Sequence, residues 1–171
     1  MSYAARGANQ SRRGFALSMA GMQHEACLRP PWTTENRVRE NCTSCGDCIR
    51  DCPESILVSG PAGTPVVDFS LGACTFCSSC AEACGEDVFR NVDTSPWSLK
   101  ANIGQSCLLN AGISCQSCTD ACDDMAIRFD MRAGPVGKVQ VLSENCTGCG
   151  ACVSVCPAKA IQIHTGEAGT S

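Results

Sequence analysis

The sequence predicts an α+β protein made of two similar modules in tandem, each with short helices and a β-hairpin around a core organised by cysteine. Of its 171 residues, 17 are Cys, and sixteen of these fall into four groups of four. Only 31 residues are Leu, Ile, Val or Phe, about 18 %, which is below the ~20 % at which chains cease to fold on apolar burial. The segments that follow the four groups also resemble one another. Cysteine chemistry must therefore supply what the apolar side chains do not.

The four groups share a spacing. The first and the fourth read C-x2-C-x2-C-x3-C-P and end at Pro53 and Pro157. The second keeps the spacing, with Gly85 in the place of Pro. In the third, seven residues separate the first two cysteines, and Asp123 takes the Pro position. The candidate metal ligands, group by group, are Cys42, Cys45, Cys48, Cys52; Cys74, Cys77, Cys80, Cys84; Cys107, Cys115, Cys118, Cys122; and Cys146, Cys149, Cys152, Cys156.

This spacing resembles the signature of bacterial ferredoxins, which binds [4Fe-4S] clusters. Three thiolates on one tight loop can bind three irons of a cubane, while the fourth ligates the neighbouring cluster in two-cluster ferredoxins. The resemblance implies four clusters, or three if the third group is not loaded, with ligands exchanged inside each module. The implied sets are Cys42, Cys45, Cys48 with Cys84; Cys74, Cys77, Cys80 with Cys52; Cys107, Cys115, Cys118 with Cys156; and Cys146, Cys149, Cys152 with Cys122.

Two other uses of cysteine fit less well. Disulfides inside such triplets would be strained, because cysteines three apart on one loop seldom meet bridge geometry. Zinc prefers pairs of C-x2-C knuckles separated by a longer stretch, so a multi-zinc module stays the weaker alternative. Cys27 belongs to no group, and we expect it to be a bystander.

The segments after the groups predict regular structure. Three residues and then an apolar pair follow each fourth cysteine, which predicts a short helix from that cysteine running into a strand. A Pro directly after the cysteine suits the first turn of such a helix. Strands are expected at 56–59 and 66–69 in the first module and at 126–131 and 138–142 in the second, each pair flanking a Gly- and Pro-containing turn.

The chain is expected to divide into five parts: a basic arm at 1–40, a first module at 41–92, a connector at 93–106, a second module at 107–165, and a flexible tail at 166–171. The arm has a net charge of +3 and the rest a net charge of −7. An anionic body argues against a nucleic-acid partner and favours a basic docking face on a protein. No run of 18 apolar residues is present, so no membrane span is expected.

Residues 11–17, SRRGFAL, resemble a twin-arginine export signal. The apolar run that follows is short and no small-x-small cleavage site comes after it, so we expect a retained cytoplasmic arm. Arg12 and Arg13, with Phe15 on one side of a short helix, suit the groove of a partner protein. The alternative is a solvated basic tail without a role.

Taken together, SRRGF, the RPPW sequence at 29–32 and the C-x7-C-x2-C-x3-C spacing of the third group resemble the ferredoxin-type accessory proteins of periplasmic nitrate reductase systems (NapF-type). The similarity covers about residues 11–163. It implies a cytoplasmic iron–sulfur protein that binds the precursor of the molybdoenzyme (nitrate reductase) catalytic subunit. It would assist cluster or cofactor assembly, or supply electrons, before export. The alternative is an electron-transfer iron–sulfur subunit of a membrane or periplasmic oxidoreductase complex.

The sequence indicates no catalytic site, and we expect that the protein is not an enzyme. His24 and His164 lie in unrelated contexts without a nucleophile pattern. The Gly-rich stretches match neither dinucleotide nor P-loop motifs. The expected chemistry is single-electron transfer.

Overall fold

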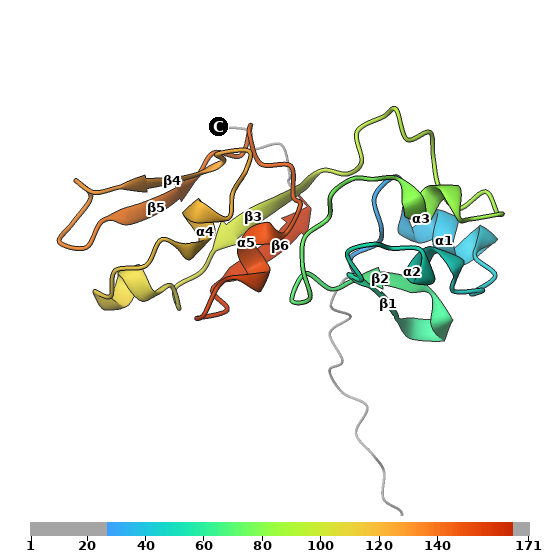
Figure 1. Ribbon diagram of the computed structural model, residues 1–171, viewed down its shortest axis with the longest axis horizontal. Coiled ribbons are helices and arrows are strands. Elements are labelled where there is room, and N and C mark those ends of the chain that lie inside the picture. Colours follow the sequence, from blue (N-terminus) through green and yellow to red (C-terminus); the bar gives the residue numbers. More distant parts are fainter. Residues whose placement is uncertain (1–26, 166–171) are drawn as a thin grey trace, which may run out of the picture.

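The structure, a computed structural model, describes residues 27–165, so Arg12, Arg13, Phe15 and the expected tail lie outside the described residues. The elements fall into two lobes along the long axis, with α1, α2, α3, β1 and β2 in one and β3 to β6 with α4 and α5 in the other (Figure 1). In chain order they are α1 (Glu35–Asn41), α2 (Asp47–Arg50), β1 (Leu57–Ser59), η1 (Pro61–Gly63), β2 (Pro65–Val67), α3 (Ser79–Glu82), β3 (Leu99–Ile103), η2 (Leu108–Ala111), α4 (Ser117–Asp120), β4 (Ile127–Asp130), β5 (Lys138–Val141), α5 (Ala151–Ser154) and β6 (Ile161–Thr165).

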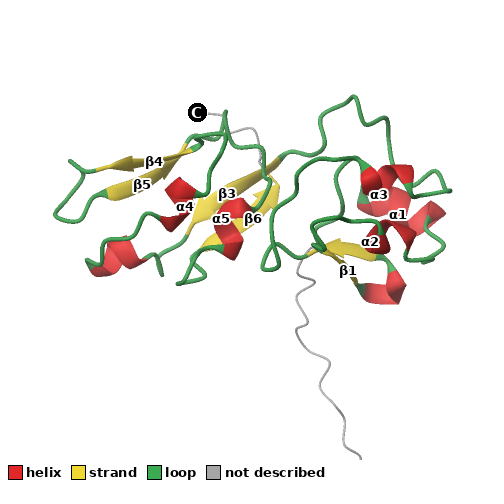
Figure 2. Cartoon of the chain, in the orientation of Figure 1, coloured by secondary structure: helices red, strands yellow, loops and turns green. Residues whose placement is uncertain are grey.

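Both expected hairpins are confirmed. β1 pairs antiparallel with β2, with Leu57 opposite Val67, and β4 pairs antiparallel with β5, with Ile127 opposite Val141. Each strand is one or two residues shorter than expected. A two-stranded hairpin is marginally stable alone, so each needs the packing of its module. Figure 2 shows how much of the chain is loop between these short elements, an α+β arrangement.

The short helices begin earlier in each group than expected. Each of α2, α3, α4 and α5 contains the third cysteine of its group and ends before the fourth. The expected helix starting at the fourth cysteine is therefore wrong, and Pro53 and Pro157 lie in turns. The backbone N–H of Ser55 donates to the carbonyl of Cys52 at 3.0 Å, which closes a turn, and Ser55 has φ 53. A residue at such a left-handed φ ends a helix, so the chain leaves the turn directly into β1.

The connector contributes a strand that the sequence patterns did not predict. β3 lies inside 93–106 and pairs antiparallel with β6, from Leu99 opposite Thr165 to Ile103 opposite Ile161. Leu99 and Ala101 alternate into the core and are buried. A strand whose partner lies some sixty residues later leaves only a weak local signal, which is why the pattern missed it.

Part of the expected arm packs against the first module and the connector. Trp32 is 4 % exposed, and its ring N–H donates to the carbonyl of Thr94 at 2.9 Å. The N–H of Val67 on β2 donates to the carbonyl of Leu28 at 2.8 Å. Val38 on α1 is 1 % exposed. The packed part of the chain therefore begins ahead of residue 41.

Two small cores hold the lobes together, and cysteines belong to both. The first consists of Cys48, Ile56, Leu57, Val67, Phe69, Cys80 and Leu99. The second consists of Ala101, Ile127, Cys152 and Ile161. Of the helices in residues 27–165, none is both long and apolar enough to cross a membrane.

Candidate metal centres

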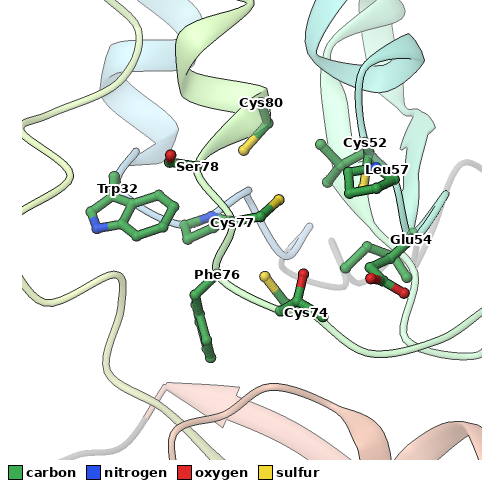
Figure 3. A pocket seen from close by; sticks show the side chains of 13 residues that line it. Trp32, Cys52, Glu54, Leu57, Cys74, Phe76, Cys77, Ser78 and Cys80 are labelled. Atoms are coloured by element: carbon green, nitrogen blue, oxygen red, sulfur yellow. The ribbon is translucent and has the colours of Figure 1, made fainter.

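Four cysteines from two different groups line a pocket at the centre of the first module. Cys74, Cys77 and Cys80 come from the second group and Cys52 from the first. Figure 3 shows their side chains arranged around the space between the second-group loop and the strand end that follows Cys52. We refer to this set of four as site two.

Two further pockets have the same composition. Three cysteines of one group and the fourth cysteine of another line each pocket. Site one is lined by Cys42, Cys45, Cys48 and Cys84. Site three is lined by Cys107, Cys115, Cys118 and Cys156. In all three pockets, the four cysteines are those of one expected ligand set.

The fourth set gathers at the second core. Cys122 and Cys146 pack against the core cluster that contains Cys152. Burial first, and then the neighbouring thiols of Cys149 and Cys146, raise the pKa of Cys152 to about 12. Cys122, Cys146, Cys149 and Cys152 are referred to as site four.

In groups one, two and four, two residues with a left-handed backbone conformation flank the second cysteine of the group, which is the middle one of its loop. Gly148 and Gly150 flank Cys149 with φ 74 and 82. Phe76 and Ser78 flank Cys77 with φ 55 and 65, although neither is Gly. Ser44 and Gly46 flank Cys45 in the same way. Successive N–H groups in such turns point to one side and form an anion-binding concavity.

Backbone N–H groups approach the cysteine sulfurs directly. Ala126 and Ala160 donate to the sulfurs of Cys122 and Cys156 at 3.2 and 3.3 Å. Ser44 donates to the sulfur of Cys42 at 3.4 Å. Hydrogen bonds of this kind stabilise anionic sulfur and tune the potential of an iron–sulfur cluster.

Burial makes five of the grouped thiols, those of Cys48, Cys74, Cys80, Cys118 and Cys152, resist ionisation in the absence of a cation. Burial first, and then the neighbouring thiols of Cys84 and Cys42, raise the pKa of Cys48 to about 11. Burial raises the pKa of Cys80 to about 12. Thiolates held together in this way need positive charge, which iron supplies as the thiol protons are released. Soft sulfur donors gathered in sets of four fit an iron–sulfur cluster.

No group of three or more His, Cys, Asp or Glu side chains within 27–165 is placed to hold a single metal ion. A mononuclear zinc site draws its thiolates to about 2.3 Å from one ion. A cubane instead takes one thiolate at each of four irons, so its ligands do not converge on one point.

The remaining candidates lie elsewhere. Cys27 is partly buried and lines a separate cavity with Arg29 and Trp97, which includes none of the grouped cysteines. His164 is exposed on β6. His24, Arg12, Arg13 and Phe15 fall outside the described residues.

A cluster of aromatic rings beside site two was not predicted from the sequence. Trp32 and Phe76 line that pocket and meet edge to face, with ring centroids 6.5 Å apart. The ring of Trp97 also meets two rings edge to face, with its centroid 5.5 Å from that of Phe76 and 6.0 Å from that of Phe69. The position of Phe76 inside a cysteine motif was the available signal. These rings keep water from one side of the pocket.

The 4Fe-4S dicluster domain family matches the chain twice, over residues 40–88 and 113–160. The two matches, with the paired thiol sets, define the class as an iron–sulfur protein with tandem dicluster domains. The "Ferredoxin-type protein NapF" of Escherichia coli (strain K12) is 39 % identical over 154 residues, covering 88 % of this chain and 92 % of that protein. The chain belongs to this family of ferredoxin-type proteins.

Two other relatives extend the comparison. The "Ferredoxin-type protein NapF" of Haemophilus influenzae is 46 % identical over 138 residues, covering 80 % of this chain and 78 % of the relative. The "Methylamine utilization ferredoxin-type protein MauM" of Methylorubrum extorquens is 31 % identical over 167 residues, covering 84 % and 76 %.

Proposed function

We propose that the protein is a cytoplasmic [4Fe-4S] ferredoxin-type protein that binds the precursor of the periplasmic nitrate reductase catalytic subunit. It assists maturation of that precursor before export, by cluster or cofactor assembly or by electron supply. The observation that carries the proposal is the similarity to NapF along 88 % of the chain.

The sixteen grouped cysteines are proposed as the ligands of four [4Fe-4S] clusters, one at each of sites one to four. The pockets lined by four cysteines at sites one, two and three support this assignment. Site three is included because its pocket closes with Cys156 despite the longer spacing in the third group. When bound, the clusters supply one-electron transfer. The chain's own residues bind iron, donate N–H groups to sulfur and exclude water.

The arm is proposed to bind the partner, through Arg12, Arg13 and Phe15. The support is its charge and sequence, since the arm carries a net charge of +3 and includes SRRGF. A cationic segment next to an anionic body can contact an acidic groove while the body stays clear of it.

An anaerobic pull-down with the full, iron-loaded chain as bait tests the partner. We expect recovery of an unexported molybdoenzyme catalytic subunit, and loss of recovery in an Arg12→Ala/Arg13→Ala variant. The matched control is Arg128→Ala/Arg132→Ala, which removes the same charge from an exposed part of the second module. The control is expected to recover the precursor as the wild type does.

Three outcomes would overturn the proposal. One is recovery of membrane subunits alone, which would favour the electron-transfer subunit. Another is equal recovery by both arginine variants. The third is cell fractionation that finds a mature periplasmic form lacking Arg12 and Arg13.

Metal analysis tests the cofactor separately. Four clusters of four irons predict about sixteen iron and about sixteen acid-labile sulfide per chain. About twelve of each would indicate that one site is not loaded. Zinc in place of iron would refute the cluster assignment.

A further inference from the structure

We propose that the four sites form one electron relay across both modules, in the spatial order one, two, four, three. The modules then join through groups two and four, and not through groups two and three, which follow each other in the chain. The inference goes beyond precursor maturation. It rests on the proposed ligand sets, but not on the identity of the partner.

Within each module, two helices bring two sites together. α2 packs against α3 in the first module, and α4 packs against α5 in the second. Cys48 on α2 and Cys80 on α3 belong to the same buried core. Cys118 on α4 packs against the core that contains Cys152 on α5. Sites one and two are therefore neighbours, and so are sites four and three.

Between the modules, the loops of groups two and four are bonded to each other. The N–H of Cys74 donates to the carbonyl of Cys149 at 2.8 Å. One proposed ligand of site two is thus joined to one proposed ligand of site four by their own backbones. From sulfur to sulfur, the path consists of covalent bonds and a single hydrogen bond.

Aromatic side chains pack at this junction between the loops of groups two and four. The ring N–H of Trp97 donates to the carbonyl of Thr147 in the group-four loop at 2.8 Å. Phe69 lies so close to Gly150 that a Cβ there would be 2.0 Å from the ring. The junction therefore depends on a fitted contact between Phe69, Trp97 and the group-four loop.

The third cysteine group lies in the second lobe, on the side away from the first module. η2, yellow in Figure 1, and α4 lie on the side of β3 and β6 away from α1, α2 and α3. η2 contacts β5 of its own module. Sites one and three are consequently the two ends of the relay.

The electron balance of the relay is simple. A one-electron reductant, such as dithionite in the test or a reduced electron carrier in the cell, loses one electron to an end site. The electron passes between neighbouring sites without breaking a bond or moving a proton. A one-electron acceptor at the other end gains it.

Two sets of cysteine substitutions in the full chain test the order. The inner variant, Cys42→Ser/Cys45→Ser/Cys107→Ser/Cys115→Ser, removes sites one and three and keeps sites two and four. The outer variant, Cys74→Ser/Cys77→Ser/Cys146→Ser/Cys149→Ser, does the opposite. Each is purified without oxygen, analysed for iron and sulfide, reduced with dithionite and measured by EPR. We expect about eight irons in each, since two clusters remain.

The inner variant is expected to show magnetic interaction between its two clusters, and the outer variant two independent signals. Independent signals in an inner variant with full iron would overturn the relay. So would an equally strong interaction in the outer variant. Iron that stays at the wild-type level in both would instead refute the ligand sets, and with them the proposed function.

A second comparison leaves every ligand intact, in case the substituted chains load too little iron. Trp97→Ala removes the hydrogen bond and the ring contacts at the junction, whereas Phe129→Ala removes a ring that packs on Gly137 in the β4–β5 hairpin. In the fully loaded, reduced protein, Trp97→Ala is expected to weaken the magnetic interaction between sites two and four, measured as slower electron-spin relaxation than in the wild type, and Phe129→Ala to leave it unchanged. Equal effects of the two substitutions, or none from either, would overturn the proposal.

Discussion

The regular cysteine loops and the loop of the third group both bring thiols together around one pocket, but they do so with different backbone conformations. In groups one, two and four, left-handed residues stand on both sides of the middle cysteine. In the third group, Gln116 follows the middle cysteine with φ −129, and η2 is inserted after Cys107. Gly112, with φ 76, ends η2 and returns the chain toward Cys115. Four thiols still line one pocket there, so the regular spacing is one way to gather them and not a requirement.

The regular loops also differ among themselves in what their left-handed positions must accommodate. Group two uses Phe76 and Ser78, whose side chains remain available to line the site-two pocket. Group four uses Gly148 and Gly150, because Leu99 and Phe69 lie where a Cβ would be. Glycine is required in group four by contacts with Phe69 of the first module and with Leu99 of β3, and in group two the same backbone is reached without it.

The largest expected effect is the loss of folding when iron is removed, and we expect it for both kinds of loop. The apolar cores are small and metal binding contributes folding free energy, so the apo chain is expected to lose cooperative folding. Circular dichroism and thermal unfolding after anaerobic chelation measure this loss. An apo protein with a sharp thermal transition would show that the apolar cores suffice.

Gly150→Ala separates packing from backbone strain. Its Cβ would meet Phe69 at 2.0 Å in a backbone with φ 82, so we expect a loss of about 2–4 kcal/mol in the free energy of unfolding. Gly112→Ala is the matched control, since it has φ 76 and open space around the added Cβ. The control should cost about 1 kcal/mol, the backbone strain alone. Denaturant unfolding of the loaded protein compares them, and equal losses would contradict the packing argument.

Cys107→Ser tests whether the displaced first cysteine of the third group is a ligand. We expect a change in site three alone, seen as lost iron or as the EPR signal of an incomplete cluster. Cys27→Ser is the control, because Cys27 lines a different cavity and should leave the iron content unchanged. An unaltered iron content and EPR spectrum in Cys107→Ser would show that Cys107 is not a ligand of site three.

The smallest expected effect concerns the turns after the fourth cysteines. Asp123 occupies the turn position held by Pro53 in group one, and Met125 donates to the carbonyl of Cys122 at 3.0 Å as Ser55 does to that of Cys52. Asp123→Pro is therefore expected to stabilise the loaded protein by about 0.5–1 kcal/mol, through a less flexible unfolded chain.

Gly85→Pro is the contrast to this change. In group two, the backbone N–H of Val88 donates to the carbonyl of Glu86, so the turn is built differently. No gain in stability is therefore expected from Gly85→Pro. Thermal unfolding of both variants checks the difference. Destabilisation by Asp123→Pro would show that the two turns are not equivalent.

Much of the local structure was predictable from the sequence. Alternating apolar residues around Gly- and Pro-containing turns indicated both hairpins, and cysteine spacing indicated which residues gather. The helices were misplaced because the pattern after the fourth cysteine was interpreted as a helix. The left-handed φ at Ser55, Met125 and Lys159 instead makes that segment a turn. No sequence signature identifies such a φ at a residue other than Gly or Asn.

By itself, the sequence determined the cysteine loops, the hairpins and the repeat, because each depends on residues a few positions apart. Only the tertiary structure decided how the two modules meet. The pairing of β3 with β6, the burial of Trp32 and the bond from Cys74 to Cys149 all join distant segments. Such contacts form wherever buried surface and backbone hydrogen bonds together outweigh the loss of chain entropy, and no local pattern records that balance.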